Sequence, residues 1–216
     1  MSSNPYLIAL NIADKPCVVV GGGKVATRKV EGLLSSGATV TVVSPILSEA
    51  LRNYAEKSRI SWIDEAYSEG ILKQLKPLLV IAATDDRKIN QQIVEDAKAI
   101  GAIVNDVSSQ ENSDFSNMAT IRRDNLQIGI SSGGASPALV RYLKAELLKV
   151  VDEAFGTLST WLNDLRSRAS ESIEDEADRL ALYQAILESD ILALLRDGDT
   201  NSAKEAFDGI VAEYVS

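Results

Sequence analysis

The stretch PCVVVGGGKVATRKVEG, residues 16–32, constrains the fold more than any other part of the chain. It opens with Cys17 to Val20, a short apolar run rich in β-branched residues, which is typical of a strand covered on both faces in a parallel sheet. Three glycines follow. From Lys24 onward the apolar residues recur at the three- and four-residue spacing of a helix. The stretch therefore predicts a strand, a glycine turn and a helix.

The glycine turn has the spacing G-x-G-x-x-A, formed by Gly21, Gly23 and Ala26. Gly21 permits a tight turn, Gly23 lets a pyrophosphate approach the backbone, and Ala26 lets the helix pack closely on the sheet. The amides and positive dipole end of the helix then bind the pyrophosphate. A second predicted strand over residues 39–43 completes the context. We predict a dinucleotide site; a tight turn without a ligand is the alternative.

The end of the second strand leaves the choice of cofactor open. An acidic residue there commonly holds the adenosine ribose, but this chain reads Ser44-Pro45-Ile46. A hydroxyl and backbone groups can also bind a ribose. NAD is therefore compatible with the sequence, and NADP is not excluded.

Composition excludes several kinds of chemistry. The 216 residues contain no histidine, which excludes imidazole catalysis and histidine metal sites, and the single Cys17 excludes an intrachain disulfide. No apolar run is long enough to span a membrane and no basic leader segment precedes one, so we expect a cytoplasmic protein. The net charge of −9 resides in residues 151–216, and no basic stripe predicts nucleic-acid binding.

Strands and helices alternate through the first half of the chain, which predicts a doubly wound parallel sheet. Ligands bind such sheets at the carboxyl ends of the strands. Thr84, Asp85 and Asp86 follow one strand, where they either face the cofactor or cap the next helix. The predicted strands are residues 6–10, 17–20, 39–43, 59–63, 78–83 and 102–104. The predicted helices are residues 24–34, 47–57, 71–75 (capped by Ser68) and 90–100. The loops at the carboxyl ends of the strands are residues 21–25, 44–46, 82–85 and 105–109.

The pattern changes after residue 117. Two alternating segments, residues 118–122 and 126–131, predict a β-hairpin outside the parallel sheet. A second glycine loop, residues 131–137, precedes a helix with Ser136 as N-cap and Pro137 at its first position. We predict that this loop binds a substrate carboxylate; a simple turn is the alternative. The helix is expected to continue to Leu165, and further helices follow over residues 173–187, 190–195 and 202–214.

Three segments, GGGKVATRK, IAATDDRKIN and ISSGGASPALVRYLKAEL, occur in an order and spacing that resembles the precorrin-2 dehydrogenase family, the N-terminal module of siroheme synthases. The resemblance covers residues 5–150. It implies an NAD-binding Rossmann domain over residues 1–113, a dimerisation and substrate region over 114–150, a helical domain over 151–216, and a homodimer. It also implies NAD-dependent oxidation of precorrin-2 to sirohydrochlorin, and some members of the family insert iron as well.

The resemblance also implies site residues. The family's cofactor-contacting segments and the strand-end loops together mark as cofactor-binding Gly21, Gly22, Gly23, Lys24, Val25, Ser44, Pro45, Ile46, Thr84, Asp85 and Asn105. The family's loop serine, phosphorylated in some members, corresponds to Ser132 or Ser131. An octacarboxylate tetrapyrrole requires cations, and basic residues gather near the second glycine loop. The expected substrate-binding residues are Ser131, Ser132, Gly133, Gly134, Arg122 and Arg141, with no metal ligand.

One departure concerns the catalytic group. Many members of the family have Asn-x-x-Asp after the fifth strand, with that aspartate assigned as acid/base, whereas this chain has Asn105-x-x-Ser108. Asp106 is the remaining carboxylate, so Asp106 and Ser108 are the candidate catalytic residues. We expect strong dehydrogenation and weak or absent iron insertion. The alternatives are a bifunctional dehydrogenase and ferrochelatase, and a non-catalytic nucleotide-sensing module, which would need only the first glycine loop.

Overall fold

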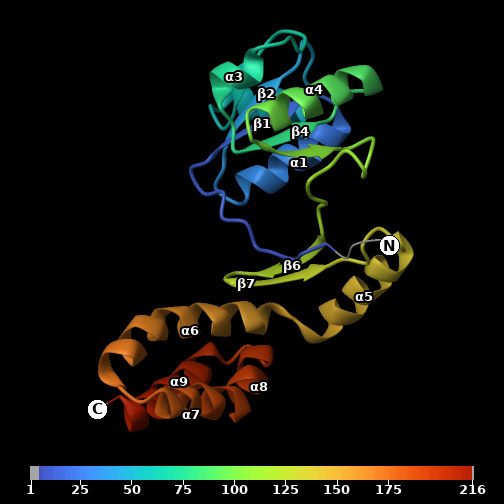
Figure 1. The fold of residues 1–216 in the computed structure, drawn as a ribbon. Helices are drawn as coiled ribbons and strands as arrows, with labels where there is room; N and C mark the ends of the chain where they lie inside the picture. The colour runs from blue at the N-terminus through green and yellow to red at the C-terminus, as the bar shows by residue number, and fades with distance from the viewer. Residues whose placement is uncertain (1–4, 216) are drawn as a thin grey trace. The chain divides into compact units, whose positions relative to one another are not determined.

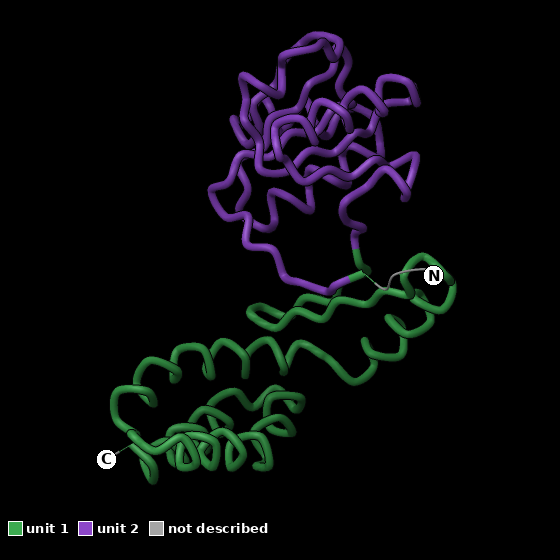
Figure 2. Tube along the Cα trace, viewed as in Figure 1, with its two compact units in different colours: residues 1–5, 118–216 green, residues 6–117 purple. Residues whose placement is uncertain are grey.

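The computed structural model describes residues 5–215 and divides into two compact units (Figure 2). The first comprises residues 6–117, and the second contains the chain from Met118 onward. Residues 6–10 form no regular secondary structure, so the strand predicted there is wrong. Their apolar side chains are exposed, Tyr6 by 90%. An apolar run becomes a strand only where a neighbour satisfies its backbone groups.

The first unit is built on a five-stranded parallel sheet in the order β3-β2-β1-β4-β5, which confirms the predicted α/β class. The strands are β1 (Pro16–Val20), β2 (Thr39–Val43), β3 (Ser61–Ile63), β4 (Leu79–Ala82) and β5 (Ile103–Asp106), and the helices are α1 (Lys24–Leu34), α2 (Glu49–Glu56), α3 (Ile71–Leu75) and α4 (Arg87–Ala99). Because β1 lies between β2 and β4, the strand order reverses beside β1, where doubly wound sheets bind ligands.

Helices cover both faces of this sheet (Figure 1). Cys17 and Val19 of β1 pack into one buried cluster with α1 and α2. Val18 and Val20 pack into another with α3 and α4. This alternation explains the unbroken apolar run, since a strand covered on both sides needs apolar residues at every position. Burial also raises the pKa of the Cys17 thiol to about 11, which makes it an inert core residue.

The second unit begins with the predicted hairpin, formed by β6 (Ala119–Arg123) and β7 (Leu126–Ile130). Ile121 and Ile130 bury one face of it against Val151, in a small cluster to which α5 (Pro137–Val150) contributes partly buried side chains. A separate and larger cluster joins the helices α6 (Glu153–Ser172), α7 (Glu176–Glu188), α8 (Ile191–Arg196) and α9 (Thr200–Tyr214). No helix within residues 5–215 is long and apolar enough to cross a membrane.

Two predictions about helices are corrected. The helix expected to run from Pro137 to Leu165 is interrupted at Val151 and Asp152. Asp152 accepts a hydrogen bond from the Ala154 amide at 3.2 Å, and this N-cap starts α6 as a new helix. Ser68 does not cap α3, whose N-cap is Gly70 in a left-handed conformation. Glycine adopts that conformation without steric cost.

Candidate functional site at the carboxyl edge of the sheet

The first glycine loop is in close contact with the loops that follow β2 and β4. Gly21 has φ +120°, and a Cβ there would lie 2.3 Å from the Ala83 carbonyl oxygen. A Cβ on Gly22 would lie only 1.8 Å from the carbonyl oxygen of Ile46. The Ser48 amide also donates to the Gly22 carbonyl at 2.8 Å. Gly21 and Gly22 are therefore required by the packing of the loops themselves.

Gly23 differs from its two neighbours because a Cβ there would meet nothing within 4 Å. It is the N-cap residue of α1 and supplies no side-chain cap. The amides of Lys24, Val25 and Ala26 have no acceptor among the described residues. Three free amides at a helix N-terminus, beside open space, fit a pyrophosphate. The residues present thus suit a dinucleotide cofactor.

The loop after β2 contains no carboxylate for a ribose. Ser44 is buried, and its hydroxyl donates to the Ile46 carbonyl at 2.8 Å. The Trp62 indole donates to the Ser44 carbonyl at 2.9 Å, which fixes the loop against β3. Ile46 is 74% exposed. Because the Ser44 hydroxyl and the Ser44 and Ile46 amides already have partners, the Pro45 carbonyl and the exposed Ile46 side chain remain for the adenosine end of a cofactor.

The loop after β4 divides the roles that the sequence left open. Asp86 is the N-cap of α4, accepting from the Lys88 amide at 2.8 Å. Thr84 is held by Asn90, whose Oδ1 accepts from the Thr84 amide at 3.1 Å and from its hydroxyl at 2.7 Å. Asp85 is exposed, and neither of those roles involves its carboxylate. Capping therefore belongs to Asp86, and Asp85 remains available to a ligand.

Asn105 is buried and its amide is fully engaged. Its Oδ1 accepts from the Lys29 ammonium at 2.9 Å, and its Nδ2 donates to the Phe115 carbonyl at 3.0 Å. Lys29 also donates to Asn117. Burial, assisted by the neighbouring Arg28, lowers the pKa of Lys29. Asn105 thus joins α1 to the chain that leaves the sheet and offers little to a cofactor.

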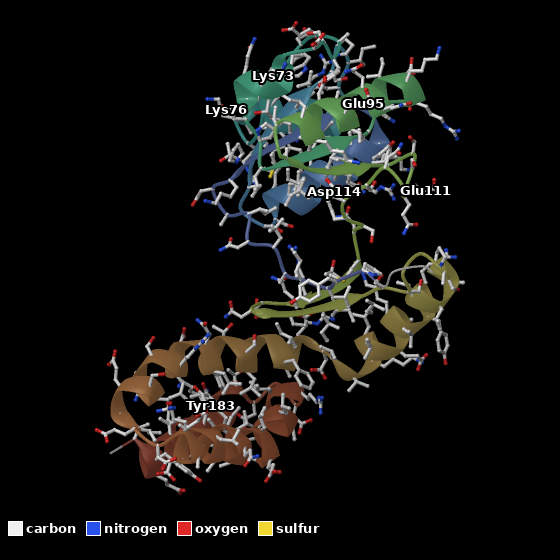
Figure 3. All side chains as sticks on the ribbon, in the orientation of Figure 1. Lys73, Lys76, Glu95, Glu111, Asp114 and Tyr183 are labelled. Atoms are coloured by element: carbon white, nitrogen blue, oxygen red, sulfur yellow. The ribbon has the colours of Figure 1, made fainter. Side chains whose placement is uncertain are left out.

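The chain after the β5 loop returns along β5. The Val104 amide donates to Asp114 Oδ2 at 3.0 Å, and the Asp114 amide donates to the Val104 carbonyl at 2.8 Å. Asp114, labelled in Figure 3, is thus paired with Val104 of β5. These two hydrogen bonds join the ends of the loop, residues 105–113, that carries Asp106 and Ser108.

Asp106 and Ser108 form a hydrogen-bonded pair in that loop. Asp106 is only 4% exposed, and its Oδ1 accepts from both the amide and the hydroxyl of Ser108, at 2.8 and 2.7 Å. Ser108 itself is exposed. The two candidate catalytic residues are therefore brought together, with Ser108 exposed and Asp106 buried.

Two residues of this edge were missed by the sequence analysis. Asn90 and Lys29 lie on helices, outside every strand-end loop, yet both bond to the β5 segment. Asn90 gave one usable signal, since it occupies an apolar-face position of α4 with Ile93, Val94 and Ala97. A polar residue on a buried helix face must find hydrogen-bond partners. Lys29 gave no signal, because a lysine on an amphipathic helix is ordinarily solvated.

The second glycine loop belongs to the other unit and satisfies much of its own backbone. Ser136 accepts from the Leu139 amide at 3.2 Å, and Ser132 accepts from the Ser136 amide at 3.0 Å. The Gly133 amide donates to Ser131 at 3.1 Å. Gly133 and Gly134 both have positive φ, which only glycine adopts freely. The loop is thus rigid, with Ser131, Gly133 and Gly134 exposed.

The arginines near this loop separate into two groups. Arg122 and Arg141 are exposed, on β6 and α5 respectively. Arg123 points to the other side of the hairpin, where it forms an ion pair with Glu153 at 3.3 Å. This follows from the alternation of side chains along a strand. Arg122 and Arg141 are thus the exposed arginines of this group.

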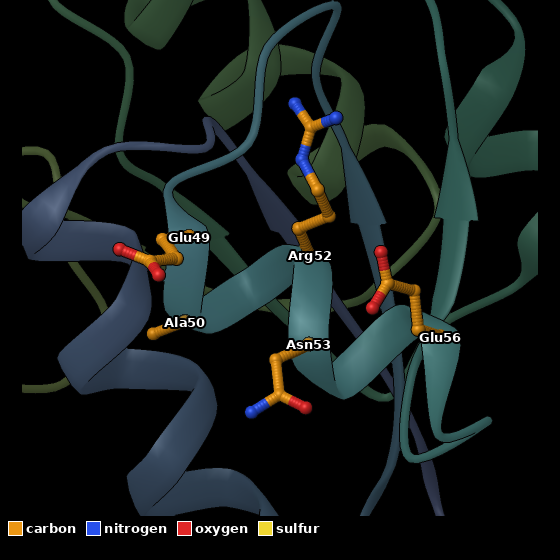
Figure 4. A pocket seen from close by; sticks show the side chains of 5 residues that line it. All are labelled: Glu49, Ala50, Arg52, Asn53 and Glu56. Carbon is orange, nitrogen blue, oxygen red and sulfur yellow. The ribbon is translucent and has the colours of Figure 1, made fainter.

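A shallow hollow also lies on α2, lined by Glu49, Ala50, Arg52, Asn53 and Glu56 (Figure 4). All five residues come from one helix, so no groups converge on it from other elements, as they do in a ligand site.

No group of three or more Cys, Asp or Glu side chains within residues 5–215 is arranged to hold a metal ion.

Comparison with known proteins agrees with this geometry. Residues 8–119, more than half of the chain, match the family described as "Putative NAD(P)-binding". The chain belongs to this NAD(P)-binding family. Residues 123–149 match a second family, described as "Sirohaem biosynthesis protein central". The NAD(P)-binding match ends at the hairpin, and the second match covers the hairpin turn, the second glycine loop and α5.

Curated relatives are similar in sequence, and a solved structure has the same fold. The chain is 36% identical over 201 residues to the siroheme synthase of Nitrosococcus oceani, covering 93% of this chain and 42% of the relative. It is 37% identical to the siroheme synthase of Nitrosospira multiformis, and this match covers 91% of this chain and 42% of the relative. The chain thus spans about two fifths of the length of these relatives. The solved structure of SirC, a precorrin-2 dehydrogenase, has the same fold, with a TM-score of 0.74 at 24% identity, covering 95% of this chain and 100% of SirC.

Proposed function

We propose that the chain catalyses the NAD-dependent oxidation of precorrin-2 to sirohydrochlorin, a step of siroheme biosynthesis. The observation that carries this proposal is the uncapped N-terminus of α1 beside open space at Gly23, in a chain whose relatives are siroheme synthases. A cytoplasmic location suits an NAD-dependent reaction.

NAD supplies the hydride acceptor when it is bound, so the protein's own task is to bind and orient. The α1 amides at Lys24 and Val25 hold the pyrophosphate, and the Pro45 carbonyl and the exposed Ile46 side chain face the adenosine end. Asp85 and Thr84 follow β4, which pairs with β1 on the side opposite β2. Asn105 acts indirectly, by holding the β5 loop to α1 through Lys29.

Substrate recognition is assigned to the second unit. A tetrapyrrole with eight carboxylates requires cations. Arg122 and Arg141 supply the charge. The exposed loop of Ser131, Ser132, Gly133 and Gly134 supplies a rigid backbone.

We also propose a homodimer. The helix α5 has no buried residue, and Leu139, Tyr142 and Val150 expose 49%, 62% and 60% of their surface. A two-stranded hairpin is marginal by itself, so both elements require a partner surface. The separate cluster of α6–α9 supports a helical region after the hairpin, while Val151 and Phe155 belong to the cluster of the hairpin. Light scattering that gives the 23.2 kDa mass of one chain at micromolar concentration would contradict the dimer.

The test is anaerobic incubation of the protein with precorrin-2 and NAD, followed by NADH and sirohydrochlorin absorbance. Formation of both, dependent on the protein, is the expected result. Tight NAD binding without oxidation would favour a nucleotide-sensing module. Iron incorporation is measured in parallel, and iron insertion as fast as NADH formation would establish the bifunctional alternative.

A further inference from the structure

The carboxylate of Asp106 faces its own loop. Its Oδ1 accepts two hydrogen bonds from Ser108, and its Oδ2 accepts one from the Asn112 amide at 3.5 Å. With 4% of its surface exposed, Asp106 has no direct path to a macrocycle lying outside the loop. A proton from the substrate must therefore reach this carboxylate through another group.

Ser108 is the group in position to transfer it. An ionised carboxylate only accepts hydrogen bonds, so the Ser108 hydroxyl must donate its one proton to Asp106. Its oxygen has two lone pairs, and the Asn90 Nδ2 donates to one of them at 3.4 Å. The other lone pair is left for a proton donor outside the loop, and Ser108 is exposed.

The buried side chain of Asn90 fixes the position of this hydroxyl. It is completely buried, and three hydrogen bonds with Thr84 fix its amide orientation, including Nδ2 to the Thr84 carbonyl at 3.1 Å. The same Nδ2 reaches Ser108. Asn90 therefore connects the loop after β4 to the loop after β5 and sets where the Ser108 oxygen lies.

We propose that Ser108 and Asp106 form a proton relay in which Ser108 contacts the substrate, Asp106 receives the proton, and Asn90 is a positioning residue. The proposal rests on the proposed function. Oxidation to a double bond removes a hydride, which NAD accepts, and a proton. As the bond from that proton to the substrate breaks, the proton binds Ser108 Oγ while the hydroxyl's own proton moves to Asp106 Oδ1. Ser108 ends unchanged, and Asp106 releases its proton to water after the product leaves.

Four variants test the relay in the NADH assay. We expect Ser108→Ala and Asp106→Asn each to lower kcat by about 100-fold, the usual contribution of general acid–base catalysis. The double variant should be no slower than either single one, because residues that act as a unit are not additive. Ser108→Thr, which keeps the hydroxyl, should retain kcat within a few-fold. Ser109→Ala is the matched control, as it removes a neighbouring hydroxyl of the same loop that bonds to none of these groups.

Asn90→Ala distinguishes positioning from a purely structural role. We expect kcat to fall and the solvent isotope effect on kcat to rise, since a displaced Ser108 makes proton transfer slower. A lower melting temperature with an unchanged isotope effect would mean that Asn90 only stabilises the fold. Full kcat in Ser108→Ala or Asp106→Asn would overturn the relay. A double variant whose loss in kcat equals the product of the two single losses would also overturn it.

A measurement without substrate separates this proposal from the proposed function. Neutron diffraction of the deuterium-exchanged protein should locate the Ser108 deuteron between Ser108 Oγ and Asp106 Oδ1. A deuteron pointing elsewhere overturns the relay even in an active dehydrogenase. A correctly placed deuteron in a protein that forms no NADH from precorrin-2 would instead refute the proposed function.

Discussion

The chain contains two glycine loops that each lead into a helix, and their backbones are satisfied in opposite ways. Before α1, Gly23 provides no cap and three amides remain free. Before α5, the Ser136 side chain caps the Leu139 amide and Pro137 has no amide hydrogen. A glycine loop before a helix is thus a strong anion site only where no side chain of the chain already occupies the helix end.

The two loops also differ in what their glycines do. Gly22 is required by contact with the neighbouring Ile46 carbonyl, whereas Gly133 has open space around it and is required only by its φ of +61°. The first loop is fixed by tertiary packing and the second by its own hydrogen bonds. The variants below test this difference, from the largest expected effect to the smallest.

Gly22→Ala should be the most damaging substitution. Its methyl group would lie 1.8 Å from the Ile46 carbonyl oxygen, so the β2 loop must move. We expect the free energy of unfolding to fall by about 3 kcal/mol, as in severe overpacking. Gly133→Ala, the matched change in the second loop, should cost about 1 kcal/mol, the strain of a left-handed residue. Urea denaturation measures both, and equal losses would contradict the comparison.

Gly23→Asp should leave folding almost unchanged and weaken NAD binding. The new side chain enters open space but places a carboxylate beside the pyrophosphate. We expect the affinity to fall by at least about 100-fold, because like charges in contact cost several kcal/mol. Gly133→Asp, in the second loop, should leave NAD affinity unchanged. Titration calorimetry decides, and retained affinity in Gly23→Asp would exclude this cofactor site.

Ser136→Ala should destabilise the second loop modestly. Loss of the N-cap bond to Leu139 removes about 1 kcal/mol. Ser48→Ala removes the cap of α2 together with the 2.8 Å hydrogen bond between the Ser48 and Thr27 hydroxyls, so it should cost more than Ser136→Ala. Thermal unfolding by circular dichroism measures both variants. No loss in Ser136→Ala would mean that the second loop does not depend on its own cap.

Lys29 should produce a small pH effect that is confined to the first unit. Its pKa is lowered in the folded protein, so the unfolded chain binds the proton more tightly. Stability contributed by Lys29 should therefore rise as pH increases from below the lowered pKa toward the ordinary lysine value. We expect unmodified protein to gain stability relative to Lys29→Met between pH 7 and pH 10. A constant difference over that range would show that burial does not perturb Lys29.

The strands, the glycine turn and the hairpin could be predicted because each is written in local spacing. The unbroken apolar run of β1 already indicates a strand that is buried on both faces. The G-x-G-x-x-A spacing describes only the turn and the helix that directly follow that strand. Predictions failed where a neighbour decided the outcome. Residues 6–10 form no strand without a partner, and Asp152 begins a new helix where the apolar spacing continued unbroken.

The site divides along the same line. The sequence by itself determined that a glycine turn opens α1 and that no imidazole acts, and its resemblance to a family made Asp106 and Ser108 the acid/base candidates. Only the tertiary structure decided that the Ser44 hydroxyl is used within its loop, that Asn105 bonds to Lys29, and that Asn90 supports Ser108. The physical reason is that a hydrogen bond depends on where distant segments meet. Local spacing specifies the element that carries a polar group, but the packed fold specifies its partner.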